Sequence, residues 1–319
     1  MKKTIVLLPG DGVGPEVTRS ATAILRESAQ EFNHQFEFVE LPIGGAAIDA
    51  AGAPLPKETL DGCRKADAVF LGAVGGPKWD SLPVGKRPES GLLDLRKGLG
   101  LYVNVRPVKL IESLRGISPL KADRLGDLDL EIVRELAGGM YFGERGHTTE
   151  KGGERAWDTE SYSTSEIECI ATFNAAMQLT LRPAQFDVML SSNMFGDILS
   201  DAAAALVGSI GLVPSASFGS SAPLFEPIHG SAPSLAGTDA ANPIGSILSA
   251  TMMLRDAFGL SLEADWVEQS LQRVLAGGYR TPDISEPGVR AVGGSVFTEI
   301  LREEMQRTFE HAERYGWGV

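Results

Sequence analysis

The stretch that decides the fold is Ile5-Val6-Leu7-Leu8-Pro9-Gly10-Asp11-Gly12-Val13-Gly14-Pro15, close to the start of the chain. Its four leading apolar residues predict a buried strand, and the glycines that follow allow a tight turn. Pro15 suits the first turn of a helix, which we expect to run to about Phe32. A strand, a turn and a helix in this order are typical of a parallel α/β protein.

The rest of the chain continues this alternation. Strands are predicted at 36–41, 68–71, 130–133 and 187–190, and helical periodicity covers 194–207 and most of the chain from Ile244 onward. The longest uncharged stretch, 202–225, contains glycines and prolines that argue against a membrane span. We interpret this stretch as a buried helix followed by a loop.

Charge and cysteine content argue against several classes of ligand and site. The 319 residues include 29 Lys and Arg against 42 Asp and Glu, and the net charge of −13 argues against general binding to nucleic acid or anionic membranes. The two cysteines, Cys63 and Cys169, cannot build a disulfide framework or a Cys-rich metal site. With no export signal in the first residues, this predicts a cytoplasmic protein.

The glycine turn does not match a dinucleotide fingerprint. Its third glycine, Gly14, comes one position too early for G-x-G-x-x-G, and no acidic residue ends a second strand at the required place. Two interpretations stay open: a tight turn beside a ligand, or a purely structural turn.

Two carboxylates mark a candidate metal site. On a helix, Asp197 and Asp201 lie one turn apart on the same face, where they repel each other unless a cation lies between them. Oxygen ligands favour Mg²⁺ or Mn²⁺ over zinc. The alternative is a solvated acidic face, which the apolar neighbours of these residues make less attractive.

Three arginines, Arg96, Arg106 and Arg134, form the second candidate group. The last two lie in or beside apolar strand-like runs, where a guanidinium must be paired or must bind an anion. An arginine cluster with a divalent cation is what a small di- or tricarboxylate requires. Each arginine taken alone could instead be part of an ordinary salt bridge.

Taken together, these segments resemble the isocitrate/isopropylmalate dehydrogenase family, whose members decarboxylate β-hydroxy acids with a metal ion. The resemblance covers nearly the whole chain. Within the family, the chain is most similar to the isopropylmalate branch. It rests on six segments in the family's order: Leu8–Glu16, Leu92–Lys97, Val133–Leu136, Gly139–Gly143, Asn193–Asp201 and Glu226–Pro233.

The resemblance implies an α/β, isopropylmalate dehydrogenase-like two-domain fold that is not a Rossmann fold. Residues 1–100 and 209–319 would form a large discontinuous domain with the nucleotide site. Residues 101–208 would form a small domain with the contacts of a homodimer. The implied reaction is NAD-dependent oxidative decarboxylation of 3-isopropylmalate to 4-methyl-2-oxopentanoate in leucine biosynthesis. The alternatives are a sister enzyme for D-malate, tartrate, isocitrate or homoisocitrate, or a subunit without catalytic activity.

The resemblance also implies roles for individual residues. Tyr141 would be the catalytic acid, Asp197 and Asp201 would bind Mg²⁺ or Mn²⁺, and Arg96, Arg106 and Arg134 would bind the substrate's carboxylates. Glu89, Leu92 and Leu93 would lie next to its isopropyl group. The residues implied for NAD are Gly76, Glu226, His229, Gly230, Ser231, Ala232, Ser234 and Asn242.

One departure from the family is large. Phe173 meets Asn174 directly, where family members have a strand with a catalytic lysine, a helix, and a strand that ends in a metal-binding aspartate. Roughly forty residues are missing, and no lysine follows Lys151. A capping box at 163–166 could begin one helix that bridges the junction. Either the protein has lost this segment or the gene model omits it, and the transcript across the junction distinguishes the two.

Overall fold

A computed structural model describes residues 1–139, 141, 144–150, 153–159 and 175–315. Its main feature is an eight-stranded sheet in the order β2-β1-β3-β10-β9-β4-β5-β8. The strands are β1 (Lys2–Gly10), β2 (Gln35–Glu40), β3 (Ala68–Ala73), β4 (Leu101–Lys109), β5 (Asp129–Glu135), β8 (Val188–Ser191), β9 (Pro214–Gly219) and β10 (Leu224–Pro227).

The strand directions confirm the predicted fold class and separate it from a Rossmann fold. β1, β2, β3 and β10 are parallel, whereas β9 runs antiparallel to both β10 and β4. β4 and β5 are also antiparallel, and β8 is parallel to β5 at the sheet edge. Because β10 pairs with β3, distant parts of the chain build one sheet.

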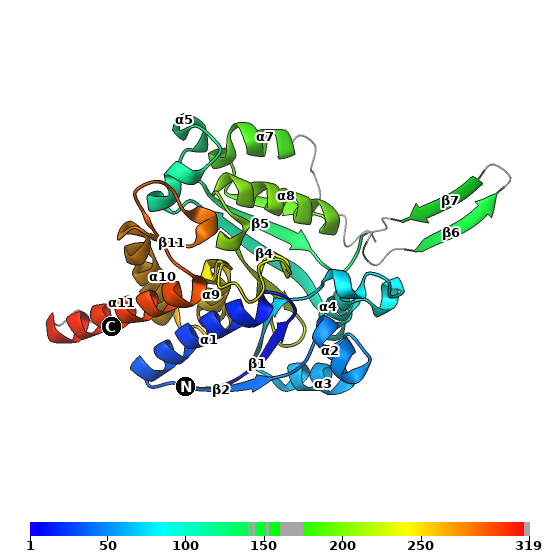
Figure 1. The fold of residues 1–319 in the computed structure, drawn as a ribbon, viewed down its shortest axis with the longest axis horizontal. Helices are drawn as coiled ribbons and strands as arrows, with labels where there is room; N and C mark the ends of the chain where they lie inside the picture. Colours follow the sequence, from blue (N-terminus) through cyan, green and yellow to red (C-terminus); the bar gives the residue numbers. More distant parts are fainter. Residues whose placement is uncertain (140, 142–143, 151–152, 160–174, 316–319) are drawn as a thin grey trace.

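Helices cover both faces of the sheet (Figure 1). The chain folds this way because β1 alternates its apolar side chains between two cores. Ile5 and Leu7 pack with α1, α9 and α10, while Val6 and Leu8 pack with α4 and Cys63 of α3. The helices are α1 (Gly14–Glu31), α2 (Gly44–Ala51), α3 (Lys57–Lys65), α4 (Pro88–Gly98), α5 (Ala122–Leu125), α7 (Ala175–Leu181), α8 (Asn193–Leu206), α9 (Ile244–Met252), α10 (Ser261–Ala276) and α11 (Gly294–Tyr315).

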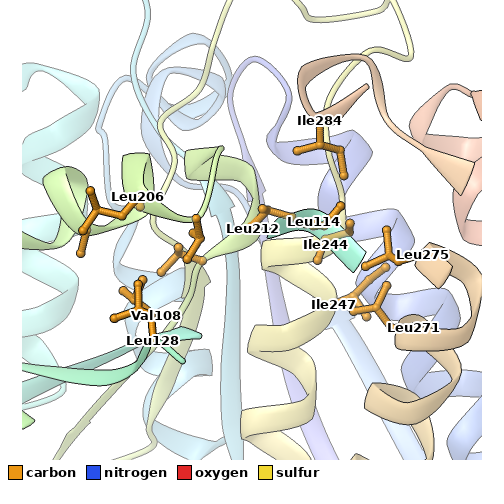
Figure 2. Packing of buried hydrophobic residues seen from close by; sticks show 14 of the residues in the cluster. Val108, Leu114, Leu128, Leu206, Leu212, Ile244, Ile247, Leu271, Leu275 and Ile284 are labelled. Carbon is orange, nitrogen blue, oxygen red and sulfur yellow. The ribbon is translucent and has the colours of Figure 1, made fainter. Parts of the chain in front are cut away.

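A third core joins the middle of the chain to its C-terminal part. Figure 2 shows Leu206 of α8 with Val108 and Leu128 on one side, and Ile247 and Leu271 of α9 and α10 on the other. All of these side chains are nearly inaccessible to solvent. The segments assigned to two domains therefore share apolar packing, and the boundaries near residues 100 and 208 stay a prediction.

Two small pairs of strands complete the described structure. β6 (Arg145–Glu150) and β7 (Gly153–Asp158) form an antiparallel hairpin that projects from the rest of the chain (Figure 1). β11 (Tyr279–Arg280) pairs with β12 (Arg290–Ala291). The described residues include no helix long and apolar enough to span a membrane.

One sequence-based expectation was wrong. The stretch 202–225 was expected to end in a loop, but after α8 it forms β9 and the start of β10. β9 reads Pro-Ser-Ala-Ser-Phe-Gly, and its first four residues are all buried. Side chains on both faces of the sheet are therefore covered, so the strand lacks the alternation that identifies a half-exposed strand. Cys169 and the capping box at 163–166 lie outside the described residues.

Candidate active site

Two of the three predicted arginines lie side by side on β4 and β5. Arg134 is opposite Asn104 in the antiparallel register, and Arg106 is two residues further along β4 on the same face. The side chains of Arg106 and Arg134 are 6% and 3% exposed. Arg106 Nε donates to Asn104 Oδ1 at 2.7 Å, so the strand itself orients this guanidinium.

The start of α8 covers the two arginines. Asp197 Oδ1 lies 3.0 Å from Arg106 Nη1 and also accepts a hydrogen bond from Arg134 Nη1. Arg134 Nε donates to Asn193 Oδ1 at 2.9 Å. A Cβ at Gly196 would lie 2.8 Å from Arg134 Cγ, so only glycine lets the helix approach this closely.

Arg96 comes from α4 and completes the group. Its Nη2 donates to Glu226 Oε1 of β10 at 2.7 Å, and both side chains are about nine-tenths buried. The Nε of Arg96 is buried without a hydrogen-bond partner among the described residues. All three arginines help to lower the pKa of Asp197, which shows that their charges converge on one place. The structure thus brings together arginines that the sequence separates by up to 38 positions.

Tyr141 lies against the same group. Its hydroxyl donates to Asp197 Oδ2 at 3.0 Å, and the Arg134 guanidinium lies 5.5 Å from the centre of its ring. Burial and the negative charge of Asp197 raise the pKa of Tyr141. The phenol is therefore fully protonated at neutral pH.

The two aspartates of α8 have opposite pKa shifts. Burial acts to raise the pKa of Asp197, but Arg134 and Arg106 outweigh it and hold that pKa below its ordinary value. Burial and then the charge of Asp197 raise the pKa of Asp201. A cation between the two carboxylates would relieve this repulsion, so the pair fits a divalent metal. Among the described residues no third His, Cys, Asp or Glu joins them.

The segment after β10 contains most of the residues predicted to bind NAD. His229 Nδ1 lies 3.0 Å from the carbonyl oxygen of Gly230, and its Nε2 is buried without a partner in the described part of the chain. Burial lowers the pKa of His229. Since Nδ1 can donate to the carbonyl oxygen, a neutral ring leaves Nε2 free to accept a hydrogen bond from a ligand, such as the amino group of adenine.

The other residues predicted to bind NAD differ in whether their side chains already form hydrogen bonds within the chain. Asn242 accepts a hydrogen bond from the N–H of Ile244 at 3.0 Å and donates to Asp283 at the same distance, so its side chain helps to begin α9. Ser234 is exposed and has no hydrogen bond to a described residue. Gly76, Gly230, Ser231 and Ala232 lie in the loops after β3 and β10.

The predicted contacts to the isopropyl group lie on α4. Leu92 and Leu93 are half-buried, and Glu89 is exposed. A Cβ on Gly75 would lie 2.6 Å from Glu89 Oε1, so this helix adjoins the loop after β3. Arg96 is on the same helix, one turn after Leu92 and Leu93.

The glycine turn after β1 lies beside the loop after β10, which contains residues predicted to bind NAD. The N–H of Val13 donates to the carbonyl of Ser231 at 2.8 Å. Gly12 has a φ of 59°, and a Cβ there would lie 2.0 Å from the same carbonyl oxygen. These contacts support the structural interpretation of the turn, and a ligand beside it stays a prediction.

Sequence reasoning missed the side chains that hold the arginines. Asn104 and Asn193 orient Arg106 and Arg134, and Ser200 Oγ accepts from Arg106 Nη1 at 2.6 Å. Two of them carried a usable signal, because Asn104 shares a strand face with Arg106 and Ser200 follows Asp197 by one helical turn. Asn193 had no signal apart from its place at the start of α8.

Known proteins are similar to this chain over most of its length. The family model described as isocitrate/isopropylmalate dehydrogenase matches residues 4–175 and 173–301. A 3-isopropylmalate dehydrogenase of Shouchella clausii is 46% identical over 356 residues, which cover 96% of this chain and 98% of the relative.

Two solved structures are similar to this chain. Isocitrate dehydrogenase of Methylococcus capsulatus has a TM-score of 0.82 at 27% identity, covering 95% of this chain and 99% of that chain. A beta-decarboxylating dehydrogenase of Thermococcus kodakarensis, in its apo form, has a TM-score of 0.75 at 30% identity and 98% coverage of both chains.

The comparisons also confirm the missing segment. The family model matches in two pieces that meet at residues 173–175, where the sequence placed the junction. The alignment with the Shouchella protein spans 356 positions but includes only 96% of the 319 residues of this chain. About fifty aligned positions of the Shouchella protein therefore have no counterpart in this chain.

Proposed function

This chain belongs to the isocitrate/isopropylmalate dehydrogenase family, and on that premise we propose that it is built for the NAD-dependent oxidative decarboxylation of 3-isopropylmalate in leucine biosynthesis. The observation that carries the proposal is the contact of buried Arg106 and Arg134 with Asp197, with the Tyr141 hydroxyl on the same carboxylate. The third arginine, Arg96, is paired with Glu226 and also helps to lower the pKa of Asp197. Buried guanidinium groups are the side chains that bind carboxylates in a fixed geometry. The relatives that carry the 3-isopropylmalate dehydrogenase name support this substrate.

Charge balance favours a dicarboxylate. The three arginines face three carboxylates, those of Asp197, Asp201 and Glu226, so the site by itself is close to neutral. A divalent cation at Asp197 and Asp201 would leave a net charge of about +2. A dianion such as 3-isopropylmalate neutralises that charge, whereas a tricarboxylate such as isocitrate leaves one negative charge unmatched. The half-buried Leu92 and Leu93 add apolar surface for the isopropyl group of 3-isopropylmalate.

Asp197 and Asp201 would hold Mg²⁺ or Mn²⁺, which would polarise the new carbonyl group, and NAD would supply the acceptor for the hydride. The chain's own residues bind and orient the substrate and the nucleotide. The arginines hold the substrate's carboxylates, and His229 Nε2 offers an unused acceptor to the nucleotide. Substrate carboxylates and the metal would have to draw Asp197 away from Arg106 and Arg134, which it now neutralises.

Tyr141 supports protonation of the decarboxylated product. Its raised pKa keeps the proton on the hydroxyl at neutral pH, and Asp197 fixes the direction in which the hydroxyl points. A proton that is available and oriented is what a general acid requires. No lysine follows Lys151 to take the proton from the substrate's hydroxyl group. Loss of such a base typically costs about 10² to 10⁴ in rate.

We also propose a homodimer. Edge strand β8 and helices α7 and α8 leave large apolar side chains exposed, and an uncovered apolar surface of this kind is typical of an interface or of a missing neighbour. The exposed residues are Met177, Leu181, Val188, Leu190, Phe195 and Ile198. The cytoplasmic location inferred from the cysteines stays a prediction.

The test is a substrate panel on two proteins: this chain, and the same chain with the strand-helix-strand of a relative inserted between Phe173 and Asn174. NADH formation at 340 nm is measured with Mn²⁺ and 3-isopropylmalate, D-malate, tartrate, isocitrate or homoisocitrate. We expect the restored protein to prefer 3-isopropylmalate and the original chain to turn it over at least a hundredfold more slowly. Arg134→Gln in the restored protein is the control that should lose activity.

Two results would contradict the proposal. A restored protein that prefers another acid of the panel would overturn the substrate. Equal turnover by the two proteins would show that the missing segment does not supply the base.

A further inference from the structure

A second cavity is lined by residues of α1 and of the segment that joins β2 to α2. Its volume is about 550 Å³, which is within the range of small-molecule sites. None of the residues assigned above to substrate, NAD or metal lines it. Two prolines, Pro9 and Pro42, provide apolar walls.

The cavity carries two unpaired positive charges. Arg19 and Arg26 line it from α1, and neither forms an ion pair or a hydrogen bond with a described residue. The Arg26 guanidinium lies 5.2 Å from the centre of the Phe38 ring, which holds it beside the sheet. In a protein with a net charge of −13, two free guanidinium groups in one cavity are a local reversal of charge.

A buried hydroxyl adds a second and independent indication. Thr22 lines the same cavity, is 6% exposed, and its Oγ1 has no hydrogen-bond partner in the described structure. A buried polar atom without a partner costs free energy, and a ligand that accepts its proton would remove that cost. Glu40 is the acidic side chain among the lining residues.

We propose that this cavity is a binding site for an elongated polyanion, with phosphate or carboxylate groups at both ends. Arg19 and Arg26 are seven residues apart on α1, and seven residues of helix span about 10.5 Å. An oligophosphate or an extended polycarboxylate is long enough to contact both side chains. The Thr22 hydroxyl lies between them along the helix and donates to the middle of the ligand.

The test uses inorganic tripolyphosphate as the probe, titrated into the whole chain by isothermal calorimetry at low ionic strength. The variant Arg19→Gln/Arg26→Gln removes the two charges of the cavity. The matched control, Lys57→Gln/Arg273→Gln, removes two exposed and unpaired positive charges elsewhere. Both variants keep the arginines of the active site, so any probe bound there contributes equally to all three titrations.

We expect the dissociation constant of one binding event to rise about tenfold or more in Arg19→Gln/Arg26→Gln and to change less than twofold in the control. Thr22→Val, which keeps the side-chain shape, should weaken the same event severalfold. An unchanged isotherm in Arg19→Gln/Arg26→Gln overturns the site. Equal weakening in both double variants also overturns it, because that result means general attraction by net charge.

Discussion

The carboxylate of Asp11 accepts a hydrogen bond from the backbone N–H of Gly75 at 2.9 Å, so the turn after β1 fixes the loop after β3. The same side chain accepts from the N–H groups of Gly45 and Ala46 at 2.8 Å each and is 5% exposed. One buried carboxylate thus connects the turn after β1, the start of α2 and the loop after β3.

This relationship predicts a large loss of stability on Asp11→Asn. Asparagine keeps one acceptor oxygen but directs an NH₂ group at a backbone N–H, which leaves at least one buried donor unpaired. We expect the free energy of unfolding, measured in urea, to fall by about 2 kcal/mol. Asp61→Asn is the control, because its exposed ion pair with Arg64 is long at 3.7 Å and should matter by less than about 0.5 kcal/mol. Equal losses would contradict the assigned role.

The second prediction concerns the metal. Calorimetry should show weak binding of Mg²⁺ or Mn²⁺ that both Asp197→Asn and Asp201→Asn remove and that Asp94→Asn, on exposed α4 surface, leaves intact. Because the pKa of Asp201 is raised, protons compete with the metal at a higher pH than for an ordinary aspartate. Binding should therefore weaken as the pH falls, before exposed carboxylates titrate. Unchanged binding in either α8 variant would remove that residue from the site.

Tyr141 should ionise later than an ordinary tyrosine. Burial raises its pKa first, and the charge of Asp197 raises it further. The difference in ultraviolet absorbance between wild type and Tyr141→Phe gives this titration, and in Asp197→Asn the midpoint should move to lower pH. A group with a raised folded pKa stabilises the protein below its unfolded pKa, near 10, and loses that effect as the pH rises further. If the titration midpoint of Tyr141 is the same in wild type and in Asp197→Asn, the Asp197 carboxylate does not raise the pKa of Tyr141.

Ser234 should weaken the preference for NAD. A carboxylate at this position would accept hydrogen bonds from the ribose hydroxyl groups and repel the 2′-phosphate of NADP, whereas serine provides one neutral hydrogen bond. The nearby Asp239 is already engaged, since its two oxygens accept from the N–H and the hydroxyl of Ser295 at 2.8 and 2.7 Å. Ser234→Asp should raise the ratio of NAD to NADP affinity about tenfold. Ser285→Asp, an exposed control, should leave it unchanged, and an equal ratio in both variants would exclude Ser234 from the nucleotide site.

The missing segment should also affect assembly. The apolar side chains exposed on α7, β8 and α8 lack the support that two further strands would give. Sedimentation should show a weaker dimer for this chain than for the version with the restored segment. Binding of a hydrophobic dye should be stronger to this chain. A stable dimer that unfolds cooperatively without the segment would contradict this expectation.

The sequence alone was sufficient for features that depend on neighbouring residues. The strand, turn and helix of residues 5–32 follow from a short apolar run, glycines and Pro15, and the structure has β1 and α1 there. The helix with Asp197 and Asp201 follows from local periodicity in the same way. The junction at Phe173 was visible because the order of the surrounding motifs is itself a sequence property.

Only the tertiary structure decided the features that need distant residues to meet. β9 could not be identified locally, because its first four residues are buried on both faces of the sheet and produce no alternation. Asp197 was predicted to hold a metal, yet its partners in the chain are Arg106, Arg134 and Tyr141, which precede it by 56 to 91 positions. They reach it because β4 and β5 pair in one register and α8 packs across them. Buried charges must find opposite charges, and which ones they find depends on that packing.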